Sequence, residues 1–155
     1  GDCLGPFTGF LEHKRRILYD KDGWYHDPVM ETGNVQEFYR AVTDGFDAVL
    51  SQYGYERSGM CYRVSVENRD TLVFFCHLGV GCTMIGHLLG IPAPVLWHGI
   101  FLAPASVTTL VTEERERGTA SFRCTGLSDT THLSLGGEPI SSSGLFPEAF
   151  QTSLE

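Results

Sequence analysis

The sequence predicts a mixed α/β domain, a three-layer sandwich in which helices flank a mainly parallel sheet. A stretch of 42 residues, from Thr71 to Thr112, contains no Asp, Glu, Lys or Arg. Glycines and prolines divide this stretch into short apolar pieces, which is typical of the buried middle of such a domain. One piece, residues 72–76, is apolar at every position and predicts a central parallel strand. Upstream, apolar residues recur at helical spacing over residues 35–53.

The N-terminal third predicts one long helix. Residues 1–33 are irregular in pattern, apart from a short amphipathic stretch at 11–19. Asn34 is a favourable N-cap, and Glu37 follows three residues later as in a capping box. We therefore expect a helix over 35–53, followed by a polar connection over 54–70.

The apolar middle predicts a strand, a turn and a second helix. After the strand at 72–76 comes a glycine-containing turn over 77–82, and then a helix that ends near Leu89. Gly90 is the expected C′ residue of this helix, because glycine readily adopts the left-handed conformation that ends helices. The segments that follow predict a strand, a charged turn and a returning strand: 106–111, 113–118 and 119–124. We expect one domain over residues 1–133 and a loose Ser- and Gly-rich tail over 134–155.

Composition narrows the classes of partner. The chain has 155 residues, with 19 acidic residues against 11 Lys and Arg and a net charge of −8. We expect no nucleic-acid partner, because binding phosphate backbones needs clustered basic residues. We expect no membrane span either, because glycine and proline interrupt the apolar stretch well before the roughly 20 residues that a span needs. The odd count of five cysteines predicts buried reduced thiols and a cytoplasmic location.

His77 is the main candidate for chemistry. It follows the predicted strand directly and precedes the turn that opens a helix. In open α/β sheets, ligands bind outside the carboxyl ends of the strands, where helix N-termini offer unpaired N–H groups. A histidine there can hydrogen-bond a phosphate oxygen or stabilise a transferring phosphoryl group. The alternative is a core histidine that is hydrogen-bonded to backbone carbonyls.

Several motifs in consistent order resemble the C-terminal portion of the histidine phosphatase superfamily, in its phosphoglycerate-mutase-like branch. Two of them are Phe-Cys-His-Leu-Gly at 75–79 and His-Leu-Leu-Gly-Ile-Pro at 87–92. Three more resemble the family's other segments: Gly-Pro-Phe-Thr-Gly-Phe at 5–10, Pro-Ala-Ser-Val at 104–107 and Leu-Ser-Asp-Thr-Thr-His-Leu at 127–133. The resemblance implies a phosphoglycerate-mutase-like fold that is incomplete at the N-terminus.

The resemblance also implies an activity and a site. Its members hydrolyse or transfer phosphomonoesters through a phosphohistidine intermediate, so a small phosphorylated substrate is implied, without metal or organic cofactor. His77 matches the family's second active-site histidine, which binds the phosphoryl group and stabilises its transfer. Leu78 and Gly79 would supply backbone N–H groups to the phosphate. Leu78 replaces a family glycine, and Pro104 replaces a family asparagine.

The nucleophile that the family uses is absent from this sequence. It is the histidine of an Arg-His-Gly motif, and no Arg-His pair occurs in the 155 residues. We therefore expect a parent protein with phosphatase or mutase activity, and no catalysis by this chain alone. The alternative is a catalytically inactive phosphate-binding or interaction module of the same fold. A missing first strand would leave an open sheet edge, which an N-terminal fragment or another copy would cover.

Other chemistries are weaker. Cys76, His77, Cys82 and His87 are residue types that bind zinc, but their spacing does not place them on one face. A nucleophilic Cys82 near the helix start lacks the arginine that a cysteine phosphatase loop requires. We expect His87 to be a helix histidine that is hydrogen-bonded within the fold, and His132 to be a packing or terminal-strand residue.

Overall fold

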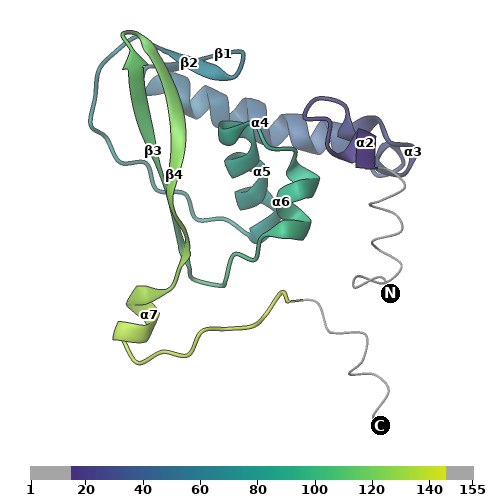
Figure 1. Cartoon of the computed structure of the whole chain (residues 1–155), viewed down its shortest axis with the longest axis vertical. Helices are drawn as coiled ribbons and strands as arrows, with labels where there is room; N and C mark the ends of the chain where they lie inside the picture. Colours follow the sequence, from purple (N-terminus) through teal and green to yellow (C-terminus); the bar gives the residue numbers. More distant parts are fainter. Residues whose placement is uncertain (1–14, 146–155) are drawn as a thin grey trace.

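The computed structural model describes residues 15–145 and shows a mixed α/β arrangement (Figure 1). Its helical elements in chain order are α2 (Arg15–Leu18), the 3-10 turn η1 (Trp24–His26), α3 (Pro28–Glu31), α4 (Val35–Gln52), α5 (Leu78–Leu89), α6 (Ala93–Gly99) and α7 (Thr131–Leu135). Its strands are β1 (Tyr55–Ser58), β2 (Cys61–Val64), β3 (Val107–Glu116) and β4 (Thr119–Asp129).

The described strands form one four-stranded sheet in the order β1-β2-β4-β3, and every pairing is antiparallel. The mixed α/β class is confirmed, but the prediction of a mainly parallel sheet is wrong for the described residues. The cause is local, because β1 and β3 are each joined to the next strand by a two-residue turn. Gly59 and Gly118 take positive φ angles of 62° and 82° in these turns, and such short connections allow only antiparallel neighbours. This sheet does not support a phosphoglycerate-mutase-like fold.

Helices α4 and α5 lie close to the positions that periodicity and turn residues predicted. Gly90 takes the left-handed conformation after α5, with φ 73°, as expected of a C-cap glycine. The prediction of a capping box at the start of α4 is wrong. Asn34 itself adopts a left-handed conformation, with φ 52°, and its side chain makes no capping hydrogen bond. Asparagine tolerates this conformation better than most residues do, so it serves here as a turn residue.

Two segments differ from the sequence prediction. The expected polar connection at 54–70 contains the β1–β2 hairpin, which the charges of Glu56, Arg57 and Arg63 obscured. The expected central strand at 72–76 is not paired; it belongs to a long connection between β2 and α5. An apolar sequence gives a central strand only if neighbouring strands satisfy its backbone, and none of the described strands is hydrogen-bonded to this segment.

The predicted hairpin at 106–124 is confirmed and is longer than expected. Strand β3 continues through most of the charged stretch that was expected to form the turn. Strands β3 and β4 therefore project well beyond the helices (Figure 1). Strand β4 carries an extra residue at each of two irregularities between Val107 and Leu110, and β3 carries one between Glu114 and Glu116.

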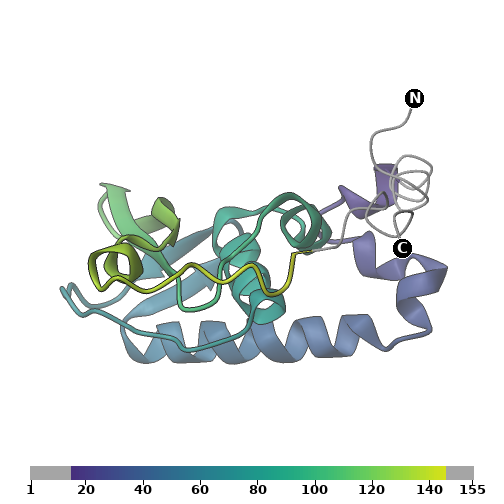
Figure 2. The same ribbon diagram turned by 90° about the horizontal axis from the view of Figure 1, so that it is seen from below.

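The core lies between the helices and the sheet. Phe46 and Leu50 of α4, Tyr62 of β2 and Leu88 of α5 form one buried cluster. Figure 2 shows α4 along one side of the molecule, with α5 packed beside it. This packing fixes the direction of α5 and so determines where its first turn lies.

The described part of the tail, after α7, has no helix or strand between residues 136 and 145. The motif at 5–10, Cys3 and the last ten residues lie outside the described residues. Within 15–145, no helix is long and apolar enough to cross a membrane.

Candidate functional site

His77 lies at the N-cap of α5, in extended conformation with φ −94° and ψ 164°. Its carbonyl accepts the first bond of the helix, from the Gly81 N–H at 2.8 Å. Its side chain is exposed and makes no capping hydrogen bond. The helix expected after His77 is present, but it begins at Leu78, so the residues expected to form a turn over 77–82 are the N-cap and the first turn of α5. The strand expected before His77 is not formed.

The first turn of α5 is accessible and firmly held. The N–H groups of Leu78 and Gly79 belong to the first turn and have no partner within the helix. A side chain built at Gly79 would meet no atom within 4 Å, so the space beside this amide is open. The Gly79 carbonyl accepts bonds from the Thr83 hydroxyl at 2.8 Å and the Trp97 indole at 3.1 Å. The structure thus brings His77, Leu78 and Gly79 together at one exposed helix end.

This helix end suits an anion better than a cation. The N-terminus of a helix carries a partial positive charge and aims its N–H groups outward. No acidic residue lies in the first turn of α5. No Lys or Arg occurs between Thr71 and Thr112, so α5 and the segments on either side of it offer an anion only imidazoles and backbone amides.

A polar network that the sequence did not reveal lies at the other end of α5. Asp47 Oδ2 accepts from Arg57 Nε at 2.8 Å and lies 2.8 Å from His87 Nε2, while Asp47 Oδ1 accepts from the Tyr62 hydroxyl at 2.8 Å. Arg57 Nη2 also donates to the Tyr62 hydroxyl at 2.6 Å and to the His87 carbonyl at 2.8 Å. The network joins α4, the β1–β2 hairpin and α5 and confirms a structural role for His87.

The network shifts the ionisation of its members. Partial burial alone would raise the pKa of Asp47, but hydrogen bonds from His87 and Tyr62 and the Arg57 charge lower it overall. Burial, together with the hydrogen bond to Asp47, raises the pKa of Tyr62 above its usual range. Since every polar atom named above already has a partner inside the fold, we interpret the network as structural support for α5.

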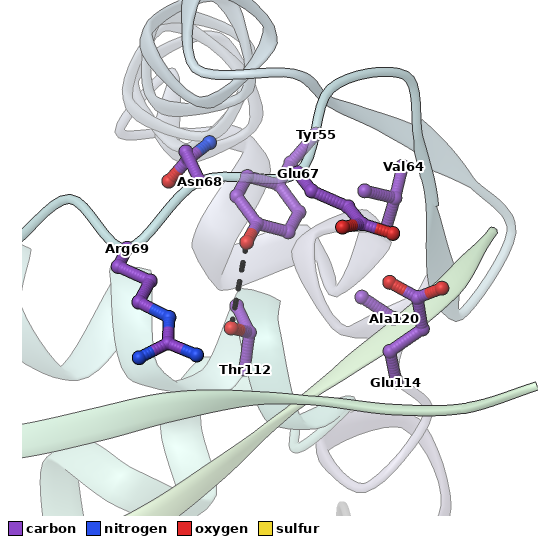
Figure 3. A pocket seen from close by; sticks show the side chains of 8 residues that line it. All are labelled: Tyr55, Val64, Glu67, Asn68, Arg69, Thr112, Glu114 and Ala120. Atoms are coloured by element: carbon purple, nitrogen blue, oxygen red, sulfur yellow. Dashed lines mark hydrogen bonds between the residues drawn. The ribbon is translucent and has the colours of Figure 1, made fainter. Parts of the chain in front are cut away.

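A hollow between the β1–β2 hairpin, the connection after it and strands β3 and β4 lies away from His77. It has a volume of about 560 Å³ and is lined by Tyr55, Val64, Glu67, Asn68, Arg69, Thr112, Glu114 and Ala120. Figure 3 shows the carboxylates of Glu67 and Glu114 on one side and Arg69 on the other, with the Tyr55 hydroxyl 3.5 Å from Thr112 Oγ1. The two carboxylates and the one guanidinium give this lining a net negative charge, which disfavours binding of a phosphate dianion. None of residues 77–79 lines this hollow.

The cysteine and metal alternatives gain no support. Among residues 15–145, no group of three or more His, Cys, Asp or Glu side chains is placed to hold a metal ion. Cys82 is buried and its pKa is raised by that burial, which suppresses the thiolate that a nucleophile needs. The prediction of buried thiols holds for Cys82, but Cys76 is exposed and Cys61 and Cys124 are partly buried.

His132 lies on α7, in the short helix after β4, and is exposed. It makes no hydrogen bond to the described site at His77. The expectation of a packing or terminal-strand residue is therefore wrong, because β4 ends at Asp129 and His132 is exposed on the following helix.

The comparisons with known proteins return nothing for this chain: no family model, no curated protein and no solved structure matches it.

Proposed function

We propose that this chain carries a phosphate-binding half-site for a small phosphorylated molecule, centred on His77 and the first-turn amides of α5. The observation that carries the proposal is the exposed imidazole at the N-cap of α5, beside the open amide of Gly79. A phosphate there would accept hydrogen bonds from His77 and from the N–H groups of Leu78 and Gly79.

The motif resemblance suggests the activity in which this half-site takes part, namely that of a phosphatase or mutase. In that mechanism an N-terminal histidine attacks phosphorus, a glutamate protonates the leaving oxygen, and water then cleaves the phosphohistidine. His77 would stabilise the transferring phosphoryl group. This chain lacks the Arg-His-Gly nucleophile, so the proposed activity belongs to a parent protein and this chain binds without turnover.

The affinity should be weak, because positive charge at the site is sparse. For one imidazole and the amides of Leu78 and Gly79 we expect a dissociation constant of about 1 mM or weaker for inorganic phosphate, a binding free energy of about −4 kcal/mol at most. A site that also carried arginines from another segment would bind much more tightly.

A phosphate titration followed by ¹H–¹⁵N NMR tests the proposal. We expect saturable shifts of the Leu78 and Gly79 amides and of the His77 imidazole, and at least threefold weaker binding in His77→Ala. His132→Ala, which removes an exposed histidine from α7, is the matched control. If His77→Ala bound phosphate with the same dissociation constant as the wild type, the proposal would be contradicted. It would also be contradicted if phosphate did not shift the amide signals of residues 78 and 79.

A hydrolysis assay tests the absence of turnover. With p-nitrophenyl phosphate as substrate, the chain should release no p-nitrophenol above background. Hydrolysis that His77→Ala abolishes would show that the chain is catalytically competent without the missing nucleophile.

The second candidate is an inactive interaction module, and the exposed apolar residues before His77 favour it. Val73 and Phe75 have 68% and 97% of their surface exposed. Aromatic surface of this kind is characteristic of segments that contact another polypeptide.

A further inference from the structure

The hollow between the β1–β2 hairpin and strands β3 and β4 adjoins a smaller one, and the two share a pair of carboxylates. The larger hollow has a volume of about 560 Å³, within the range of roughly 300–1,000 Å³ that is usual for small-molecule sites. Val64, Glu67 and Glu114 line both hollows, so the two carboxylates lie where these spaces meet. Most of the lining side chains are polar or charged, which suits a charged ligand better than an apolar one.

Hydrogen bonds fix the walls of the larger hollow. The Val64 N–H donates to the Gly118 carbonyl at 2.9 Å, which joins the end of β2 to the turn between β3 and β4. In the connection after β2, Asn68 Nδ2 donates to the Tyr53 carbonyl at 2.6 Å. The segments that carry the lining residues are therefore held in place without a ligand, and a preformed site costs little reorganisation on binding.

The charged groups of the lining are available to a ligand. Within residues 15–145, no ion pair and no side-chain hydrogen bond engages Glu67 or Arg69. Glu114 Oε1 accepts one bond, from the Gly118 N–H at 2.6 Å, and its other carboxylate oxygen has no partner among these residues. Figure 3 shows the carboxylates of Glu67 and Glu114 pointing toward one another, with Arg69 on the far side of the Tyr55 ring. Two facing carboxylates attract a cationic group, and a separate guanidinium attracts a carboxylate.

We propose that this hollow binds a small basic amino acid, whose cationic side chain lies between Glu67 and Glu114 and whose carboxylate binds Arg69. The lining supplies two carboxylates and one guanidinium, and a basic amino acid carries two cationic groups and one carboxylate. The Tyr55 ring lies between the two charged ends of the hollow in Figure 3 and would cover the methylene chain of the ligand. None of residues 77–79 lines the hollow, so this proposal is independent of phosphate binding at His77.

The same lining disfavours other classes of ligand. A phosphate dianion would meet a net negative charge. A metal ion would lack ligands, because no group of three or more His, Cys, Asp or Glu side chains within 15–145 is placed to hold one. A diamine without a carboxylate would bind the two glutamates but would be repelled by Arg69.

A titration with L-arginine followed by ¹H–¹⁵N NMR tests the site. We expect saturable shifts of the amides of residues 64–69 and 112–114, with a dissociation constant of about 1 mM or tighter, and no shifts at 78 and 79. Glu67→Gln should bind at least fivefold more weakly. Glu138→Gln is the matched control, because it neutralises an exposed glutamate that lies after α7 and outside the hollow. The proposal would be overturned if the wild type showed no saturable binding up to about 10 mM, or if Glu67→Gln bound as tightly as the wild type.

Agmatine tests the role of Arg69, because it keeps both cationic groups of L-arginine and lacks the carboxylate. Charge attraction alone favours agmatine, since the lining is net negative. We expect instead that the wild type binds L-arginine at least threefold more tightly than agmatine, and that Arg69→Gln reverses this preference. Arg40→Gln, at an exposed position of α4, is the matched control and should keep the preference of the wild type.

Two results would overturn the assigned ligand. Binding of agmatine by the wild type as tight as that of L-arginine would exclude a role for the carboxylate. A short peptide with a C-terminal arginine that binds at least tenfold more tightly than L-arginine would replace the free amino acid by a peptide terminus.

Discussion

Asp47 Oδ2 and His87 Nε2 lie 2.8 Å apart although 40 residues separate them in the chain. The contact joins the C-terminal half of α4 to the last turn of α5, and Arg57 and Tyr62 from the β1–β2 hairpin complete it. Both side chains are mostly buried, so their interaction is less screened than a surface ion pair. Asp47 is therefore the residue through which both helices and the hairpin are held together.

Replacing Asp47 should destabilise the fold. Asp47→Ala leaves the Tyr62 hydroxyl, the Arg57 guanidinium and the His87 ring without their shared acceptor. We expect the free energy of unfolding to fall by about 2 kcal/mol, measured by urea denaturation. Asp44→Ala, on the exposed side of α4, is the matched control and should change stability by about 0.5 kcal/mol or less. Equal losses in both variants would show that the network contributes nothing specific.

The Asp47 network should also make stability depend on pH. The folded-state pKa of Asp47 lies below its ordinary value of 3.8, so the unfolded chain takes up the proton first on acidification. The stabilisation is fully present above the unfolded pKa and is lost as pH falls through the folded one. The difference in unfolding free energy between wild type and Asp47→Asn should be constant at neutral pH and should shrink below about pH 4. Urea midpoints at several pH values measure it, and a difference that persists unchanged to pH 3 would contradict the assigned shift.

Two glycines should respond in opposite directions to alanine. Gly45 lies inside α4 with open space around it, so Gly45→Ala should raise the free energy of unfolding by up to about 1 kcal/mol. Gly90 holds the left-handed conformation after α5, and an added methyl group there would meet the Met60 side chain. Gly90→Ala should therefore lower stability by about 1 kcal/mol or more. Thermal unfolding followed by circular dichroism compares the two, and an increase in both would contradict the Gly90 assignment.

Thiol labelling should separate the cysteines on α5 and before it. Cys76 is exposed and Cys82 is completely buried, and burial raises the pKa of each thiol. Iodoacetamide should modify Cys76 in the folded chain and Cys82 only after unfolding. Peptide mass spectrometry at increasing urea concentration distinguishes them. Labelling of Cys82 before the unfolding transition would show that α5 is less tightly packed than the structure indicates.

The elements that sequence predicted well are those specified by local signals. Helical periodicity over 35–53 and the glycine and proline after Leu89 are short-range features, and they gave α4 and α5 with small errors at the ends. The position of His77 at a helix start followed from the same turn signals. The β3–β4 hairpin followed from two apolar stretches around a charged glycine-containing turn.

The sequence predictions are wrong where the local structure depends on residues that are distant in the chain. Residues 72–76 have the composition of a central strand, yet pairing depends on neighbours that the described part of this chain does not place beside them. Conversely, Glu56, Arg57 and Arg63 gave 55–64 a polar appearance, although these residues form a hairpin whose Tyr62 is buried against α4. The Asp47–His87 contact could not be predicted, because it depends on how two helices pack and not on either sequence segment alone.

The bond from the Trp97 indole to the Gly79 carbonyl places a fluorophore one hydrogen bond away from the proposed phosphate site. The Trp97 ring also packs edge-on against Trp24, with centroids 5.2 Å apart, and these are the two tryptophans of the chain. A change in the opening turn of α5 therefore alters the surroundings of Trp97, one of the chain's two indoles. The chain carries an intrinsic optical signal for events at its helix end.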